Sequence, residues 1–192
     1  MIKQESPLYY IRRNKQKFIF ITLAVLVLIC FGLFYPYSKQ QNQSDNQSNS
    51  SLITETTKII QGNSMEPLIQ DGQEAILLEN YYQRNEVQRG DIVAYDYKGN
   101  KNPLIKKVEV VGGDTLEFKV DKLLVNNEIL SNGQKEPYIF SEKQKKMIGL
   151  YIKKEKLVDN SYLLFGENIY NSLDSRRFGA VSVEGFLGKF DY

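Results

Sequence analysis

The sequence predicts a mainly β fold with an antiparallel sheet, placed behind a single apolar helix near the amino terminus. Three observations lead to this prediction. Thirteen tyrosines and ten phenylalanines, which favour strands, accompany few long helical patterns. Short runs of strand-forming residues are separated by turn residues along much of the chain. An uncharged run extends from Phe18 to Phe34, which is far too long for one strand of a small domain.

This apolar run, "FIFITLAVLVLICFGLF", predicts a membrane anchor. At about 1.5 Å per residue, a helix of this length spans roughly 26 Å, slightly less than the ~30 Å hydrocarbon core of a bilayer. A cleaved secretory signal is the alternative, but the bulky sequence "YPYSKQ" follows where cleavage needs small residues. We therefore expect residues 18–37 to form an uncleaved, single-pass anchor in contact with the lipid bilayer.

Charge and composition on either side of the anchor predict its topology. Residues 1–17 are basic just before the apolar run and should stay in the cytoplasm. Residues 38–51 consist almost wholly of Gln, Asn and Ser, which predicts a flexible tether. Residues 52–192 then form a β-rich domain outside the cytoplasm. The basic side chains that precede the run are Arg12, Arg13, Lys15 and Lys17.

The strands of this domain are predicted from runs of β-branched, aromatic and aliphatic residues. Turn signals such as Asp71-Gly72 and Gly112-Gly113-Asp114 separate the runs, so we expect hairpins and antiparallel pairing. The predicted strands are Thr57–Ile60, Glu74–Leu78, Asp91–Tyr97, Leu104–Val111, Thr115–Val120, Lys122–Val125 and Tyr162–Phe165.

Composition excludes several kinds of chemistry. The chain has no histidine, and its one cysteine, Cys30, lies within the apolar run. A Ser-His-Asp triad, a disulfide framework and a soluble thiol nucleophile are therefore excluded, and the commonest metal ligand is missing. We expect neither a metal nor a cofactor. A net charge of +2 gives no electrostatic reason to expect nucleic acid as a partner.

The strand "LIKKVEVV", Leu104–Val111, places a lysine on an apolar face. Because side chains alternate between the faces of a strand, Lys106 shares its face with aliphatic residues, whereas Lys107 has Glu109 beside it. Burial disfavours the charged form of lysine, and a pKa of about 7 to 8 would let Lys106 accept a proton from a serine. The alternative is that Lys106 extends its ammonium group to the sheet edge.

The candidate to give its proton to Lys106 is Ser64 in "GNSMEPLI", between a glycine turn and a proline. Three further stretches must be considered together with it. In chain order the four are "GNSMEPLI", "RGDIVAY", "IKKVEVVGGDTL" and "FGENIYNSLDSRRFG". Together they resemble the conserved boxes of the bacterial type I signal peptidases, which are membrane-anchored serine–lysine proteases with an antiparallel β catalytic domain. The resemblance covers most of the chain from residue 59 to residue 188.

The resemblance implies a role for particular residues. Ser64 would be the nucleophile and Lys106 the general base of a dyad that cleaves signal peptides from exported preproteins after small-x-small motifs, through an acyl-enzyme. Ser172 would orient the lysine amine by hydrogen bonding. Asp174 and Arg176 would form an ion pair that stabilises the last box, "FGENIYNSLDSRRFG" at residues 165–179.

The resemblance also implies the oxyanion donors and the substrate pockets. The Ser64 main-chain N–H would bind the oxyanion, while Gly62 stands where some relatives carry a second donor, a serine hydroxyl. Lys107 and Glu167 replace an arginine and an aspartate of the family, and we expect them to pair with each other. The residues implied to line the substrate pockets are Ile60, Met65, Ile69 and Ile105.

The family varies in length at about residues 131–160, so we expect a variable insertion there. Its lysine-rich part, Ser141–Lys156, is interpreted as solvated, with contact to anionic lipid or to an envelope polymer as the alternative. The alternative function is that of a non-proteolytic, membrane-anchored partner in assembling surface proteins or pili. A self-cleaving repressor-type serine–lysine protease is a third hypothesis, but the apolar run occupies the place of its DNA-binding domain.

Overall fold

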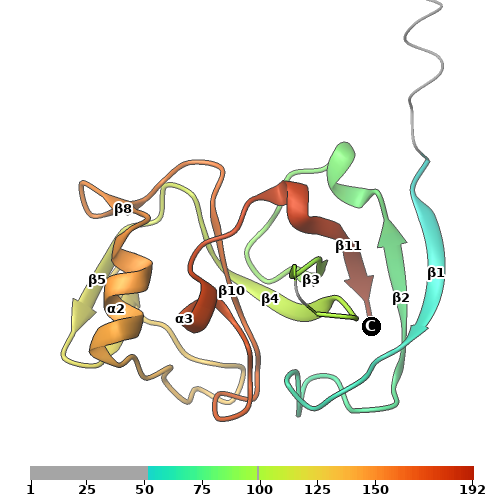
Figure 1. Ribbon diagram of the computed structural model, residues 1–192, viewed down its shortest axis with the longest axis horizontal. Helices are drawn as coiled ribbons and strands as arrows, with labels where there is room; N and C mark the ends of the chain where they lie inside the picture. The colour runs from blue at the N-terminus through green and yellow to red at the C-terminus, as the bar shows by residue number, and fades with distance from the viewer. Residues whose placement is uncertain (1–51, 99) are drawn as a thin grey trace, which may run out of the picture. The chain divides into compact units, whose positions relative to one another are not determined.

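The computed structural model of the protein describes residues 52–98 and 100–192 (Figure 1). The predicted cytoplasmic terminus, the anchor and the tether, residues 1–17, 18–37 and 38–51, lie outside the described residues. Among the helices that the structure describes, none is long and apolar enough to cross a membrane.

A six-stranded antiparallel sheet forms the larger part of the fold, with the strand order β1-β2-β11-β3-β4-β10. The carboxy-terminal strand β11 inserts between β2 and β3, so the end of the chain completes the sheet (Figure 1). The strands are β1 (Thr54–Ile59), β2 (Glu74–Glu79), β3 (Ile92–Tyr95), β4 (Leu104–Val111), β10 (Tyr162–Phe165) and β11 (Phe186–Asp191).

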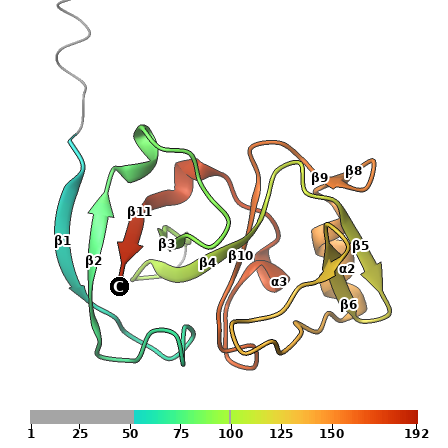
Figure 2. The same ribbon diagram turned by 180° about the vertical axis from the view of Figure 1, so that it is seen from behind.

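A smaller lobe is inserted between β4 and β10. It contains a second antiparallel sheet, a short hairpin and a helix, and it lies at the opposite end of the molecule from β1 and β2 in both views (Figures 1 and 2). Its elements are β5 (Leu116–Lys119), β6 (Lys122–Val125), β7 (Glu128–Ile129), α2 (Glu142–Gly149), β8 (Ile152–Lys153) and β9 (Lys156–Leu157).

Three short helical turns complete the described structure. They are η1 (Tyr81–Gln83), α3 (Ser175–Phe178) and η2 (Val183–Gly185). The helix α3 follows β10 and contacts it, which places the last box of the sequence beside β4 and β10. This arrangement brings residues 164–179 close to the strand that carries Lys106.

The mainly β, antiparallel prediction is confirmed for the described residues. The strands predicted at Leu104–Val111, Lys122–Val125 and Tyr162–Phe165 have the predicted bounds, whereas β1 begins at Thr54 rather than at Thr57. The sequence analysis missed β11, because its short alternation is interrupted by Gly188, which pairs with two strands where a side chain would not fit.

The helix α2, within the lysine-rich segment, was also missed, although its sequence contains a recognisable signal. Ser141 and Gln144 form a capping box, in which the Ser141 hydroxyl accepts from the Gln144 main-chain N–H and the Gln144 side chain accepts from the Ser141 N–H. The motif Ser-x-x-Gln could therefore have predicted the start of this helix. Ile148, which is fully buried, attaches the helix to the core of the smaller lobe.

Candidate active site

Lys106 lies on a buried face of β4, as its strand pattern predicts. Its side chain is 2% exposed. Lys106 is paired in register with Val93 of β3, and Val93 and Val108 belong to one buried hydrophobic cluster. The amine Nζ donates to Ser64 Oγ at 2.7 Å and to the main-chain oxygen of Ile105 at 2.7 Å. The amine is therefore turned toward the serine and does not extend to the sheet edge.

The surroundings of the Lys106 amine favour its neutral form. Burial lowers the pKa of Lys106 from 10.5 to about 8, and the charge of Asp174 opposes part of this effect. Desolvation wins because an ammonium group in an apolar interior loses its hydration while only one nearby carboxylate compensates for it. About a tenth of Lys106 is thus uncharged at pH 7, far more than for an ordinary lysine, and a neutral amine can accept the proton of the Ser64 hydroxyl.

Ser64 lies on a turn that is fixed from several sides. Gly62 has a φ of +90°, a left-handed conformation that favours glycine, and its N–H donates to Asp71 Oδ1 at 2.7 Å. The Ile69 N–H donates to the Met65 carbonyl at 3.0 Å, and both of these side chains are buried in the core. The turn therefore presents the half-buried Ser64 hydroxyl from a rigid base.

The loop that follows β10 packs directly against the backbone of Ser64. The Asn168 main-chain N–H donates to the Ser64 carbonyl oxygen at 3.0 Å, and Asn168 Nδ2 donates to the Asn63 carbonyl oxygen at 3.2 Å. Gly166 lies so close that a Cβ atom there would meet the Ser64 carbonyl oxygen and Ser172. The last box thus holds the Ser64 turn through one main-chain bond, one side-chain bond and a close contact at Gly166.

The Ser64 main-chain N–H is the donor that the family resemblance implies for an oxyanion. Among the described residues it donates to no acceptor, whereas the Gly62 N–H donates to Asp71 and the carbonyl oxygens of Asn63 and Ser64 both accept hydrogen bonds. Gly62 contributes no side-chain donor. An oxyanion next to Ser64 would therefore meet at least one preorganised N–H donor, which is the arrangement that stabilises tetrahedral intermediates of acyl transfer.

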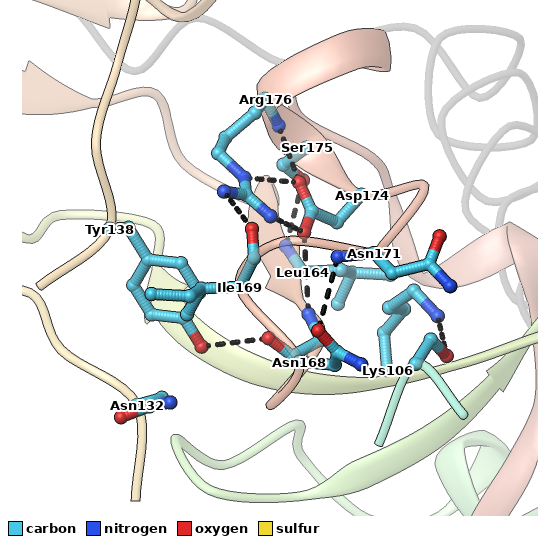
Figure 3. Close-up of polar contacts among 12 residues, drawn as sticks. Lys106, Asn132, Tyr138, Leu164, Asn168, Ile169, Asn171, Asp174, Ser175 and Arg176 are labelled. Carbon is cyan, nitrogen blue, oxygen red and sulfur yellow. Dashed lines mark hydrogen bonds and ion pairs between the residues drawn. The ribbon is translucent and has the colours of Figure 1, made fainter. Parts of the chain in front are cut away.

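The ion pair predicted between Asp174 and Arg176 is present and buried. Arg176 donates to the two oxygens of Asp174 at 2.9 Å and 2.7 Å, and Asp174 is fully buried (Figure 3). Asp174 also accepts from the Gly166 N–H at 3.4 Å, while Arg176 Nη1 donates to the Ile169 carbonyl at 2.8 Å. The pair therefore connects both ends of the loop that holds Ser64.

The hydrogen bond predicted between Ser172 and the Lys106 amine is absent, which corrects the expectation. The buried Ser172 hydroxyl has no hydrogen-bond partner among the described residues. The amine instead donates to Ser64 and to the Ile105 carbonyl, and Ser172 packs against Gly166. Ser172 nevertheless lies near the backbone of Ser64, because a Cβ atom at Gly166 would meet both residues.

The pairing predicted between Lys107 and Glu167 is confirmed. Lys107 Nζ lies 3.0 Å from Glu167 Oε1 and 2.9 Å from Glu109 Oε1, on the opposite face of β4 from the amine of Lys106. Glu167 Oε2 also accepts from the Gly133 N–H at 2.6 Å. Burial raises the pKa of Glu109, and Lys107 opposes this effect. The three charges join β4 to the start of the loop that contacts Ser64.

A groove of about 570 Å³ is lined in part by Ile105, the residue that precedes Lys106 in β4. Of the four residues implied to form substrate pockets, Ile105 lines this groove. The other three, Ile60, Met65 and Ile69, are buried in the hydrophobic cluster beneath it. Strand alternation explains the difference at β1, because Ile59 is 63% exposed and lines the groove while Ile60 points inward.

Sequence reasoning missed three asparagines, Asn63, Asn168 and Asn171, that connect the Ser64 turn to the last box. Asn171 Nδ2 donates to Asn63 Oδ1 at 2.9 Å, across a long separation in the chain. Neither periodicity nor local charge signals such a contact. Within the part of the chain that the structure describes, no group of His, Cys, Asp and Glu side chains could hold a metal ion.

The chain is similar to several characterised proteins. Residues 49–192 match the family model described as signal peptidase, peptidase S26. The signal peptidase I of Bacillus amyloliquefaciens is 28% identical over 193 residues, covering 97% of this chain and 86% of the relative. The signal peptidase IB of Staphylococcus aureus is 31% identical over 153 residues, covering 71% of this chain and 76% of the relative.

A solved structure is also similar in sequence. The crystal structure of a signal peptidase I from Enterococcus faecalis V583 is 25% identical, with a TM-score of 0.41, and the match covers 55% of this chain and 97% of that one. The family match and the sequence relatives together show that the chain belongs to the bacterial type I signal peptidases, a family of serine endopeptidases.

Proposed function

We propose that this protein removes the signal peptides of exported preproteins by a Ser64–Lys106 dyad and an acyl-enzyme intermediate. The observation that carries the proposal is the 2.7 Å contact between Ser64 Oγ and a lysine amine that is 2% exposed. A lysine in water is almost wholly protonated at neutral pH and cannot act as a base. Burial of Lys106, with its pKa lowered to about 8, removes this obstacle.

In the acylation step, neutral Lys106 accepts the proton of Ser64 as Oγ attacks the scissile carbonyl carbon. The Ser64 N–H stabilises the negative charge on the carbonyl oxygen of the tetrahedral intermediate. Lys106 then gives its proton to the leaving amine as the carbon–nitrogen bond breaks, which releases the mature protein. In deacylation Lys106 takes a proton from water, and the hydroxide displaces Ser64 Oγ, which recovers that proton.

The groove lined by Ile105 supports an extended peptide as the substrate. Its floor is apolar, with Leu77, Ala94 and Phe190 contributed by the six-stranded sheet, and Ile105 lies next to the residue that carries the base. Apolar side chains of a signal peptide could bury surface there, which favours binding by about 25 cal/mol per Å². Small residues before the cut would let the peptide backbone approach Ser64 closely.

We extend the proposal to the topology of the chain. Residues 18–37 would span the cytoplasmic membrane once, residues 1–17 would stay in the cytoplasm, and residues 52–192 would act outside it. The uncharged run and the basic residues before it support this arrangement. An anchor of this kind would hold the groove near membrane-inserted signal peptides, which raises their effective concentration.

Cleavage of a defined preprotein tests the proposal. The full chain, reconstituted in phospholipid vesicles, would be incubated with a preprotein whose signal peptide ends in Ala-x-Ala, and mass spectrometry would identify the new amino terminus. We expect the wild type to cut after the second alanine. Ser64→Ala and Lys106→Ala should each lower the rate at least about a thousandfold, because each removes one half of the dyad.

Two variants control for general damage. Lys153→Ala removes an exposed lysine of β8, and Ser182→Ala removes an exposed serine before η2; both should cut at the wild-type rate. Cleavage at the wild-type rate by Ser64→Ala or Lys106→Ala would refute the dyad. Absence of any cleavage by the wild type, on several preproteins, would favour the non-proteolytic assembly partner instead.

A further inference from the structure

Asn63, the residue before the proposed nucleophile, accepts hydrogen bonds through both its side chain and its main-chain carbonyl, although it is exposed. Its Oδ1 accepts from Asn171 Nδ2 at 2.9 Å. Its carbonyl oxygen accepts from Asn168 Nδ2 at 3.2 Å and from the Glu66 N–H at 3.2 Å. The two asparagine partners belong to the last box, which lies about a hundred residues later in the chain, so these bonds join two segments that local structure does not hold together.

The contacts form a closed network around the backbone of Ser64. Asn168 donates its main-chain N–H to the Ser64 carbonyl at 3.0 Å, so Asn168 holds the carbonyl oxygens of both Asn63 and Ser64. The Asn171 N–H in turn donates to Asn168 Oδ1 at 3.1 Å, which fixes the side chain of Asn168 (Figure 3). The peptide unit that leads into the nucleophile is therefore bonded from one side by the last box.

We propose that Asn63 is a positioning residue for Ser64. Its side chain, held by Asn171, keeps the Ser64 turn and the last box in register, so that Ser64 Oγ stays within 2.7 Å of Lys106 Nζ and the Ser64 N–H stays free. This inference rests on the proposed function, because it assumes that Ser64 is the nucleophile. It assigns no contact between Asn63 and the substrate.

The physical basis is the sensitivity of acyl transfer to geometry. A displacement of about 1 Å at the reacting groups costs about a hundredfold in rate. One neutral hydrogen bond at an exposed site contributes little to global stability, so loss of Asn63 should leave the fold intact while the Ser64 turn gains freedom. The Asp71 contact with Gly62, on the other side of the turn, remains in place and limits the effect.

A double-mutant cycle tests this inference on the reconstituted full chain with the preprotein of the cleavage assay. Asn63→Ala and Asn171→Ala should each lower kcat about tenfold and change KM less than about twofold, because positioning acts on the chemical step. The double variant should lose about tenfold as well, since either substitution removes the same contact. Losses that multiply to about a hundredfold would overturn the inference.

Asn63→Asp provides a readout that a merely structural role would not move. The carboxylate still accepts from Asn171 Nδ2, so kcat above about pH 9 should lie within about threefold of the wild type. Its negative charge near the dyad should favour the ammonium form of Lys106 and move the acid limb of the pH profile to higher pH. An Asn63→Asp enzyme as slow as Asn63→Ala at high pH would contradict a role for the Asn171 contact.

Asn85→Ala is the matched control. Asn85 also donates one amide hydrogen bond, to the Tyr81 carbonyl at 2.8 Å, but it lines a separate groove with Tyr82 and Asn160. It should keep the wild-type kcat, and a tenfold loss in this variant would overturn the assignment to Asn63. Cleavage by the wild type with an unchanged kcat in Asn63→Ala would refute the positioning role alone, whereas an inactive wild type would refute the proposed function and this inference together.

Discussion

Gly166 lies against Ser64 so closely that a Cβ atom at this position would come to 2.5 Å from the Ser64 carbonyl oxygen. The same atom would also collide with the side chain of Ser172. Backbone oxygen cannot rotate away as a flexible side chain can, so either the turn of Ser64 or the loop of Gly166 must move. The requirement for glycine here comes from space and not from its φ angle.

Gly166→Ala should therefore be more harmful to catalysis than to stability. We expect kcat to fall at least about a hundredfold, because the shift falls on Ser64, the proposed nucleophile. The free energy of unfolding should fall by about 1–3 kcal/mol, as overpacking usually costs. Kinetics and chemical denaturation would measure both. Gly149→Ala, where a Cβ meets nothing within 4 Å, is the control; a normal kcat in Gly166→Ala would contradict the close contact.

The pH dependence of cleavage should follow the titration of Lys106. The base must be neutral to accept a proton, and burial lowers its pKa to about 8. As pH falls below about 8, Lys106 becomes protonated, so kcat/KM should decline about tenfold per pH unit. A profile of kcat/KM from pH 5 to pH 10 would measure this limb. A rate that stays constant from pH 9 down to pH 5 would exclude Lys106 as the base.

Much of the core of the site could be predicted because it depends on local pattern. The alternation of "LIKKVEVV" placed Lys106 on a buried face of β4, and the charge pattern paired Lys107 with Glu109. The resemblance to a family supplied the partner of Lys106, since no periodicity links Ser64 to a strand 42 residues away.

The parts that could not be predicted depend on contacts between distant segments. The asparagine contacts of Asn63 form only when the last box returns to the Ser64 turn, and an exposed asparagine carries no sequence signal for this. The prediction that the Ser172 hydroxyl bonds to the Lys106 amine was wrong for a similar reason. The rotamer of Ser172 depends on its packing against Gly166, which the local sequence does not reveal. Strand β11 was missed because a glycine interrupts its pattern.

Lys106 should reduce the stability of the protein at neutral pH, which is the expected cost of a buried base. Lowering its pKa from 10.5 to about 8 corresponds to about 3 kcal/mol of unfavourable burial of the charged form. Lys106→Met removes the charge and keeps much of the volume, although it leaves the Ile105 carbonyl without its side-chain donor. We expect the free energy of unfolding at pH 7 to rise by about 1–3 kcal/mol while cleavage is lost.

The sign of the pH dependence provides a second measurement. Between about pH 8 and pH 10.5 the unfolded chain binds more protons at this lysine than the folded chain does, so wild-type stability rises with pH in that window. The advantage of Lys106→Met should therefore be greatest below about pH 8 and should shrink toward pH 10.5. Urea denaturation of both proteins at pH 7 and pH 10 would check this, and a less stable Lys106→Met at pH 7 would contradict the buried charge.

Lys107 neutralises two carboxylates on the other face of β4, and its removal should disturb the site indirectly. The side chains of Glu109 and Glu167 are 10% and 2% exposed, so Lys107→Met leaves two buried negative charges without their cation. Breaking a buried pair by removing one partner costs about 3–5 kcal/mol. Without Lys107 the two carboxylates repel each other, so Glu167 should move away from Glu109. Because Glu167 directly precedes Asn168, this movement should also displace the bond from Asn168 to Ser64 and lower kcat about tenfold or more.

Two further variants distinguish this mechanism from loss of an ordinary surface charge. Lys107→Arg keeps the cation and should restore most of the stability and of kcat, because a guanidinium group can pair with both carboxylates. Lys119→Met removes a lysine whose partner Glu117 is 3.6 Å away and exposed, and it should change the free energy of unfolding by less than about 1 kcal/mol. If Lys107→Met were as mild as Lys119→Met, the three charges would not hold the loop. The contact between Asn168 and Ser64 would then be maintained by other bonds of the loop, such as the buried Asp174–Arg176 pair and the bond from Asn132 to the Glu167 carbonyl.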